Sequence, residues 1–148
     1  MEPGRGENRR HLEQARDAVL DLVAEQEAAG IPPGQVVLAG FSQGGVIALL
    51  AALASERRLA GVMGLSTYLP LPDTAPLPCR GLPTFLAHGD LDEVLPFFLG
   101  VRARDRLRAA GCAVTWHEYP MGHAVCTEEI AHIGQWLGRV LQDGMETG

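Results

Sequence analysis

The sequence lacks an excess of basic residues. It carries 12 lysines and arginines against 18 aspartates and glutamates, which gives a formal charge of −6 over 148 residues. This acidic balance argues against nucleic acid as a general partner, because phosphate binding favours a basic surface. The basic residues that do cluster, Arg102, Arg104, Arg106 and Arg108, are interrupted by Asp105 and are interpreted as a solvated helix face.

The sequence also lacks long apolar runs and a recognisable cysteine pattern. No stretch reaches the roughly 20 apolar residues that span a bilayer, and the first ten residues lack the apolar core of a secretory signal peptide. We therefore predict a cytoplasmic protein with no integral membrane contact. Cys79, Cys112 and Cys126 have neither a paired nor a zinc-binding spacing, so we expect reduced thiols, as in a cytosolic protein, and no metal site.

What is present is the composition of a soluble globular protein, with 47% hydrophobic and 20% charged residues, and a length that suits one domain over residues 1–148. Apolar periodicity predicts helices over about 9–29, 43–55, 95–110 and 126–142, and strands over about 35–40, 60–66, 82–88 and 112–119. Prolines at 70, 72, 76 and 78 predict an irregular loop over 67–81. This alternation predicts an α/β fold, with about four parallel strands flanked by helices and the last strand near the sheet edge.

One pentapeptide, Gly40-Phe41-Ser42-Gln43-Gly44, stands between a strand pattern and a helix pattern. A G-x-S-x-G sequence in this context is typical of a nucleophile elbow, a sharp turn that exposes a serine hydroxyl. We expect side chains at both glycine positions to collide with the turn. The Gln43 amide would lie at the helix N-terminus, where negative charge is favoured. The alternative is an ordinary turn with a surface serine.

A nucleophilic serine needs a base, and the base needs a carboxylate to orient it. Both residue types follow later strands, where side chains of a parallel sheet gather at one edge. Asp90 and Asp92 follow the third predicted strand, and His123 follows the fourth. The order serine, aspartate, histidine is that of α/β-hydrolases. His88, which precedes a glycine at a strand end, is interpreted as structural.

Four segments in register carry a family resemblance: LAGFSQGG (38–45), LSTYLP (65–70), HGDLDEVLP (88–96) and YPMGHAVC (119–126). Over residues 9–142 the chain resembles the carboxylesterase/acyl-protein thioesterase (phospholipase/carboxylesterase) family of α/β-hydrolases. The resemblance implies hydrolysis of carboxylic esters or acyl thioesters, on small molecules or acylated proteins, without a cofactor. It identifies Ser42 as the nucleophile, Asp92 rather than Asp90 as the acid, His123 as the base and the Gln43 amide as an oxyanion donor.

Leu69, Met121 and Phe97 either line an acyl pocket or pack beneath the loops. We predict an acyl-binding role for Leu69 and Met121 and favour packing for Phe97. The resemblance also implies four earlier strands and a His-Gly-rich loop with a second oxyanion donor, and we expect the chain to lack both. Residues 36–39 would then form an open apolar edge of the sheet. We expect this edge to pair with a second copy of the chain in a homodimer or with a strand donated by a partner.

Two other interpretations stay open at this point. One is a catalytically weak or inactive remnant of the fold that serves as a binding or dimerisation module. The other is an enzyme similar to dienelactone hydrolases, although that resemblance requires cysteine at position 42.

Overall fold

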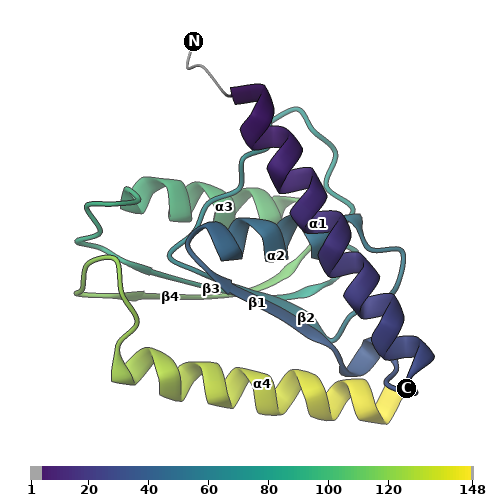
Figure 1. Ribbon diagram of the computed structural model, residues 1–148. Coiled ribbons are helices and arrows are strands. Elements are labelled where there is room, and N and C mark those ends of the chain that lie inside the picture. The colour runs from purple at the N-terminus through teal and green to yellow at the C-terminus, as the bar shows by residue number, and fades with distance from the viewer. Residues whose placement is uncertain (1–4, 148) are drawn as a thin grey trace.

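A four-stranded parallel β-sheet with helices on both faces forms the computed structural model, which describes residues 5–147 (Figure 1). The elements in chain order are α1 (Arg5–Ala28), the 3-10 helix η1 (Pro33–Gln35), β1 (Val37–Phe41), α2 (Gln43–Ala54), β2 (Gly61–Leu65), β3 (Pro83–Gly89), α3 (Phe97–Ala109), β4 (Ala113–Tyr119) and α4 (Thr127–Thr147). Each predicted helix and strand is present, so the predicted fold class is confirmed. The outermost helices are longer than the apolar periodicity indicated.

The strands lie in the order β1-β2-β3-β4, and each neighbouring pair is parallel. Phe41 pairs with Leu65, and Gly89 pairs with Tyr119, so the carboxyl ends of all four strands reach one edge of the sheet. The last strand lies at one side of the sheet, as predicted. The loops that follow the four strands are therefore brought together.

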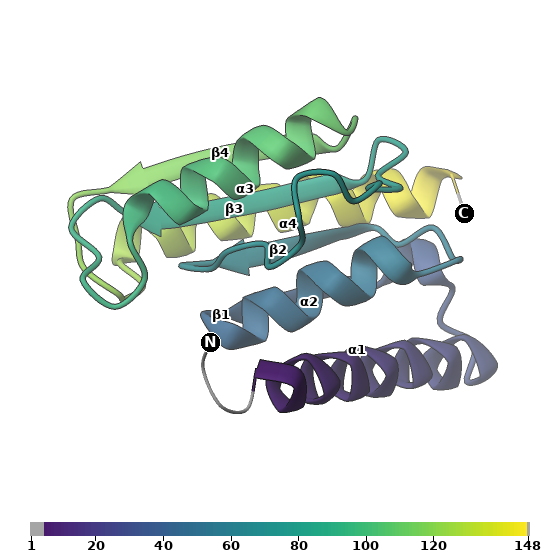
Figure 2. The ribbon, with the colours of Figure 1, turned by 90° about the horizontal axis from the view of Figure 1, so that it is seen from above.

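Helices α1, α2 and α3 cover one face of the sheet, and α4 covers the other (Figures 1 and 2). Successive residues of a strand point to opposite faces, and β3 follows this rule. Leu86 joins the core beneath α2, while Phe85 packs against Trp136 of α4. Both faces of the central strands are thus buried, which explains their continuous apolar sequences. Within residues 5–147, no helix combines the length and apolar character needed to cross a bilayer.

The segment between β2 and β3 has no helix, as its prolines predicted, yet it is well anchored. Leu69, Leu71 and Leu77 pack against the core beneath α2. Arg106 of α3 donates hydrogen bonds to the carbonyl oxygens of Leu71 (2.6 Å) and Pro72 (2.8 Å). The interpretation of the α3 arginines as a purely solvated face is therefore wrong for Arg106, because the loop supplies carbonyl acceptors beside it.

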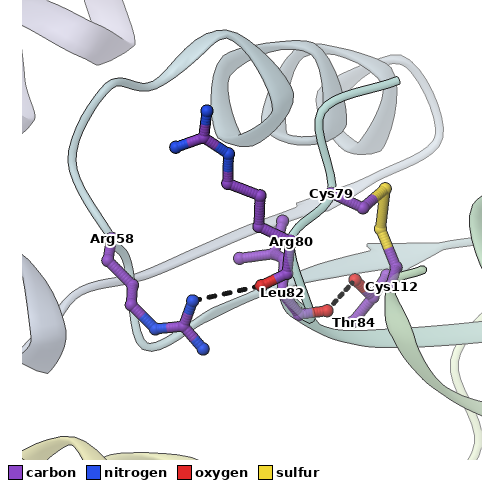
Figure 3. The surroundings of a disulfide bond; sticks show 6 residues. All are labelled: Arg58, Cys79, Arg80, Leu82, Thr84 and Cys112. Carbon is purple, nitrogen blue, oxygen red and sulfur yellow. Dashed lines mark hydrogen bonds between the residues drawn. A yellow bond between two sulfur atoms is a disulfide. The ribbon is translucent and has the colours of Figure 1, made fainter. Parts of the chain in front are cut away.

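Cys79 and Cys112 form a disulfide that the sequence analysis did not predict (Figure 3). Cys112 directly precedes β4, and Cys79 lies in the loop shortly before β3. The parallel pairing of Pro83 with Ala113 brings these two segments together. Both cysteines are buried, and their Cα atoms lie 4.9 Å apart. The prediction of three reduced thiols is thus wrong for this pair. Reduced thiols are typical of cytosolic proteins, so the disulfide removes one argument for the predicted cytoplasmic location, which stays a prediction.

Strand β1 forms the other side of the sheet, which confirms the predicted open edge. The Val36 carbonyl accepts a hydrogen bond from Ala60, and the Ser42 amide donates to Leu65. Because the backbone of a strand faces alternate sides, the polar groups of Val37, Ala39 and Phe41 point away from β2. Within residues 5–147, half of the backbone polar groups of β1 consequently have no strand partner.

Candidate active site

Three side chains from three different loops form a continuous chain of hydrogen bonds at the carboxyl edge of the sheet. His123 Nε2 lies 3.0 Å from Ser42 Oγ, and His123 Nδ1 lies 2.7 Å from Asp92 Oδ2. Ser42 follows β1, Asp92 follows β3 and His123 follows β4. The structure therefore brings together the three side chains that the sequence analysis selected, although 81 residues separate the serine from the histidine.

Ser42 has an unusual backbone conformation, with φ 57° and ψ −121°. Few residues other than glycine adopt a positive φ, and such strain persists only where the surroundings enforce it. A Cβ at Gly40 would overlap the carbonyl group of Gly44, as the sequence analysis expected. The matching expectation for Gly44 is wrong, because a Cβ there meets no atom within 4 Å. The second crowded position is Gly45, which packs against Thr67.

Asp92 is the buried aspartate of its loop, and Asp90 is exposed. Asp92 Oδ1 accepts hydrogen bonds from the backbone amides of Val94 (2.9 Å) and Leu95 (2.8 Å), which leaves Oδ2 to His123. Burial alone raises the pKa of Asp92, but the hydrogen bonds from Leu95, His123 and Val94 outweigh it. The net pKa lies below its usual value of 3.8, so the group is a carboxylate at neutral pH.

The loop that carries His123 is held against the end of β3. The Met121 carbonyl accepts a hydrogen bond from the Leu91 amide at 3.1 Å, and a Cβ at Gly89 would overlap the Met121 carbonyl. The imidazole of His123 also packs against the ring of Phe41, with centroids 4.8 Å apart. Backbone hydrogen bonds and ring packing together orient the histidine toward Ser42.

Gln43 is the first residue of α2 and is exposed. The first amides of a helix have no acceptor within the helix, and the positive end of the helix dipole lies beside them. The backbone N–H of Gln43 is therefore suitably placed to bind an anion next to Ser42.

The two residues predicted to line an acyl pocket pack on opposite sides of the sheet. Leu69 packs against the core beneath α2, and Met121 packs against the core beneath α4. Phe97 lies between His88 and Trp116, with ring centroids 5.9 and 6.0 Å away. The acyl-binding role of Leu69 and Met121 stays a prediction, whereas Phe97 takes the packing role.

Thr67 was missed by the sequence analysis although it contacts the serine directly. Its Oγ1 donates a 2.7 Å hydrogen bond to the Ser42 carbonyl. The available signal was its position just after β2, the strand next to β1. His88, interpreted only as structural, lies with Nε2 3.4 Å from Asp92 Oδ2.

The arrangement can transfer a proton from a hydroxyl to an imidazole whose opposite nitrogen faces a carboxylate. That relay activates a serine for attack on an acyl carbon. In the part of the chain that the structure describes, histidine, cysteine, aspartate and glutamate side chains form no group of three that could hold a metal ion.

Comparison with known proteins gives a consistent picture. The family described as Phospholipase/Carboxylesterase matches residues 2–141. The chain is 40% identical over 124 residues to acyl-protein thioesterase 1 of Neurospora crassa, covering 79% of this chain and 51% of that protein. It is 35% identical over 136 residues to acyl-protein thioesterase 1 of Emericella nidulans, covering 86% of this chain and 57% of that protein. The chain thus spans about half the length of the curated relatives it matches.

Among solved structures, Arabidopsis thaliana SOBER1 superposes with a TM-score of 0.82 at 27% identity. The superposition covers 88% of this chain and 64% of that one. The similarity therefore extends over most of the described fold.

Proposed function

The chain belongs to the phospholipase/carboxylesterase family, and from that membership we propose that it is a serine hydrolase of carboxylic esters or acyl thioesters. The observation that carries the proposal is the hydrogen-bond chain from Ser42 Oγ through His123 to Asp92, with distances of 3.0 and 2.7 Å. The similarity to proteins named acyl-protein thioesterase 1 supports acylated proteins as one class of substrate, beside small-molecule esters.

In the proposed reaction, His123 Nε2 removes the proton of Ser42 as Oγ attacks the acyl carbon. The imidazolium is stabilised by Asp92, whose lowered pKa keeps it ionised. His123 then returns the proton to the leaving oxygen or sulfur, and an acyl-enzyme forms on Ser42. Water, deprotonated by His123, then attacks the acyl carbon, and the bond from that carbon to Ser42 Oγ breaks. His123 returns the proton to Oγ, and the carboxylic acid is released.

The Gln43 amide is proposed to stabilise the negative oxygen of the tetrahedral intermediate. An oxyanion donor of this kind contributes about 3 kcal/mol to the transition state, which corresponds to roughly a hundred- to a thousandfold in rate. The proposal rests on the position of Gln43 at the N-terminus of α2, directly after the nucleophile.

The test measures hydrolysis of chromogenic short-chain esters and of matched acyl thioesters by the full chain. Ser42→Ala is expected to abolish turnover and labelling by a fluorophosphonate probe. Ser55→Ala is the matched control, because Ser55 lies at the opposite end of α2. Asp92→Asn is expected to lower kcat by roughly 10⁴, since the amide favours the wrong histidine tautomer. Equal turnover by wild type and Ser42→Ala contradicts the proposal, and so does a wild-type protein that the probe does not label.

The acyl-binding role of Leu69 and Met121 is tested with the same esters at increasing chain length. Leu69→Ala and Met121→Ala are expected to shift the preferred acyl length and to leave turnover of the acetyl ester unchanged. Because the two side chains pack on opposite sides of the sheet, each variant is scored separately. A residue whose substitution leaves the chain-length profile unchanged has no such role.

A further inference from the structure

His88 is a fully buried histidine directly beneath the loop that carries Asp92. It lies near the end of β3 with 1% of its surface exposed. Its Nε2 lies 2.9 Å from the carbonyl oxygen of Leu95 and 3.4 Å from Asp92 Oδ2. The imidazole is therefore in contact with both the backbone and the functional carboxylate of the loop.

The surroundings of His88 fix which nitrogen carries the proton. Both neighbours of Nε2 are acceptors, so Nε2 is protonated and donates its hydrogen bond to Leu95. Nδ1 faces Gly100 of α3 so closely that a Cβ there would lie 2.5 Å away. The ring of Phe97 packs edge-on against the imidazole, with centroids 5.9 Å apart. The histidine is thus held in one orientation by α3.

His88 and Asp92 both bind the backbone of Leu95, His88 at its carbonyl and Asp92 at its amide. The Leu95 amide donates to Asp92 Oδ1 at 2.8 Å, and the Leu95 carbonyl accepts from His88. Asp92 Oδ2 remains for His123 at 2.7 Å. Because Leu95 is fixed at both its amide and its carbonyl, the orientation of the carboxylate depends on the buried imidazole.

We propose that His88 is a positioning residue, which aims the Asp92 carboxylate at His123 by holding the Leu95 carbonyl from beneath. The proposal rests on the proposed hydrolase function for its kinetic readout, but not for its spectroscopic one. It assigns to Gly100 a matching role, since only a glycine lets α3 approach the imidazole this closely.

Two substitutions of His88 separate the effect of its hydrogen bond from the effect of its side-chain volume. His88→Met removes the N–H donor and keeps a similar volume. His88→Gln keeps an N–H donor near the position of Nε2. His88→Met is expected to lower kcat between about tenfold and a hundredfold with KM unchanged, because small misplacements of a reacting group have effects of this size. His88→Gln is expected to recover most of that loss.

A third variant displaces the ring without changing the histidine. In Gly100→Ala the new methyl group forces the imidazole away from α3, and kcat is expected to fall as in His88→Met. Gly134→Ala is the matched control, because Gly134 is also helical and a Cβ there meets nothing within 4 Å. Val62→Ala, in the buried part of β2, controls for a general loss of stability.

The proton spectrum gives a readout that does not depend on turnover. The Nδ1 proton that His123 shares with Asp92 is expected at low field in the wild type, Gly134→Ala and His88→Gln. It is expected to shift or disappear in His88→Met and Gly100→Ala. Folded His88→Met protein that keeps both this resonance and the wild-type kcat overturns the proposal. A loss of kcat in His88→Gln as large as that in His88→Met also overturns the proposal. If the wild type shows the resonance, His88→Met shifts it and neither protein hydrolyses any ester, the positioning role stands and the hydrolase function fails.

Discussion

Thr67 Oγ1 donates a hydrogen bond of 2.7 Å to the carbonyl oxygen of Ser42. Thr67 is 3% exposed, and the glycines that face it, Gly45 and Gly64, leave room only for its methyl and hydroxyl groups. The loop after β2 thereby supports the turn at Ser42, whose φ is positive. The position of Ser42 thus depends on a neighbouring strand as well as on its own turn.

Thr67→Val is expected to destabilise the protein by about 1 kcal/mol, since it removes one buried hydrogen bond and keeps the side-chain shape. It is also expected to lower kcat, because the strained turn loses a support. Urea unfolding and ester turnover measure the two effects. Thr67→Ser is the control, and it should keep most of the activity. Equal kcat for Thr67→Val and wild type contradicts a positioning role for this bond.

The glycines of the elbow should differ sharply in their tolerance. Gly40→Ala is expected to prevent folding or to abolish activity, because its Cβ would overlap the Gly44 carbonyl. Gly44→Ala is expected to fold with wild-type or slightly higher stability, since alanine favours the helix and nothing lies within 4 Å. Thermal unfolding of the two variants tests the difference. Equal losses of melting temperature in the two variants would contradict this explanation, because the space around the added Cβ differs at the two glycines.

The sequence was sufficient for those features that a local pattern determines. Apolar periodicity and proline placement gave the order of the elements, and the parallel sheet then followed from their alternation. That Ser42, Asp92 and His123 lie close together could be predicted because each follows a strand, and the carboxyl ends of parallel strands share one edge.

Features that depend on packing across the sheet could not be found in this way. Cys79 and Cys112 meet only because β3 and β4 are neighbours in a particular register. The tolerance of Gly44 depends on which side of its helix faces the turn. Leu69 and Met121 looked equivalent as apolar residues beside the site, yet the chain delivers them to opposite faces of the sheet.

Glu129, in the first turn of α4, is completely buried, and its Oε2 has no hydrogen-bond partner within the described residues. Burial raises its pKa above the usual value of 4.5, although a hydrogen bond from the Cys126 amide opposes the shift. A carboxyl group whose pKa is raised on folding favours the folded state while it is protonated. That stability is lost as the pH rises through the raised pKa.

Glu129→Gln cannot ionise, so its free energy of unfolding should not contain this loss. The difference in unfolding free energy, variant minus wild type, is therefore expected to increase as the pH rises from the usual glutamate pKa of 4.5 through the raised pKa. Urea unfolding at several pH values measures it. The test is the change of this difference with pH and not its absolute value, because the glutamine amide also buries polar atoms and shifts the stability by a constant amount. A difference that stays constant with pH contradicts the assignment.

The disulfide between Cys79 and Cys112 closes a loop with a sequence separation of 33. Loop-closure entropy for that length corresponds to about 3 to 4 kcal/mol of stability. Reduction is expected to lower the free energy of unfolding of the wild type by this amount, which lowers its urea midpoint. Cys79→Ala/Cys112→Ala should be insensitive to reductant. Cys126→Ser should respond to reductant as the wild type does, because Cys126 is a free thiol. A wild-type midpoint that reductant leaves unchanged would exclude a stabilising role for the bond.

The unpaired edge of β1 should promote association between chains. Val37, Ala39 and Phe41 direct their amide and carbonyl groups away from β2, and residues 36–44 contain no charge or proline that would block another strand. Sedimentation velocity is expected to show a mass that rises with protein concentration.

Ala39→Lys places a charge on an exposed position of this edge and is expected to hold the protein at the mass of one chain. Ala109→Lys, at an exposed position near the end of α3, is the control for added charge and should associate as the wild type does. Association that Ala39→Lys leaves unchanged would place the contact on another surface, and a wild type at the mass of one chain throughout would show that the edge does not pair.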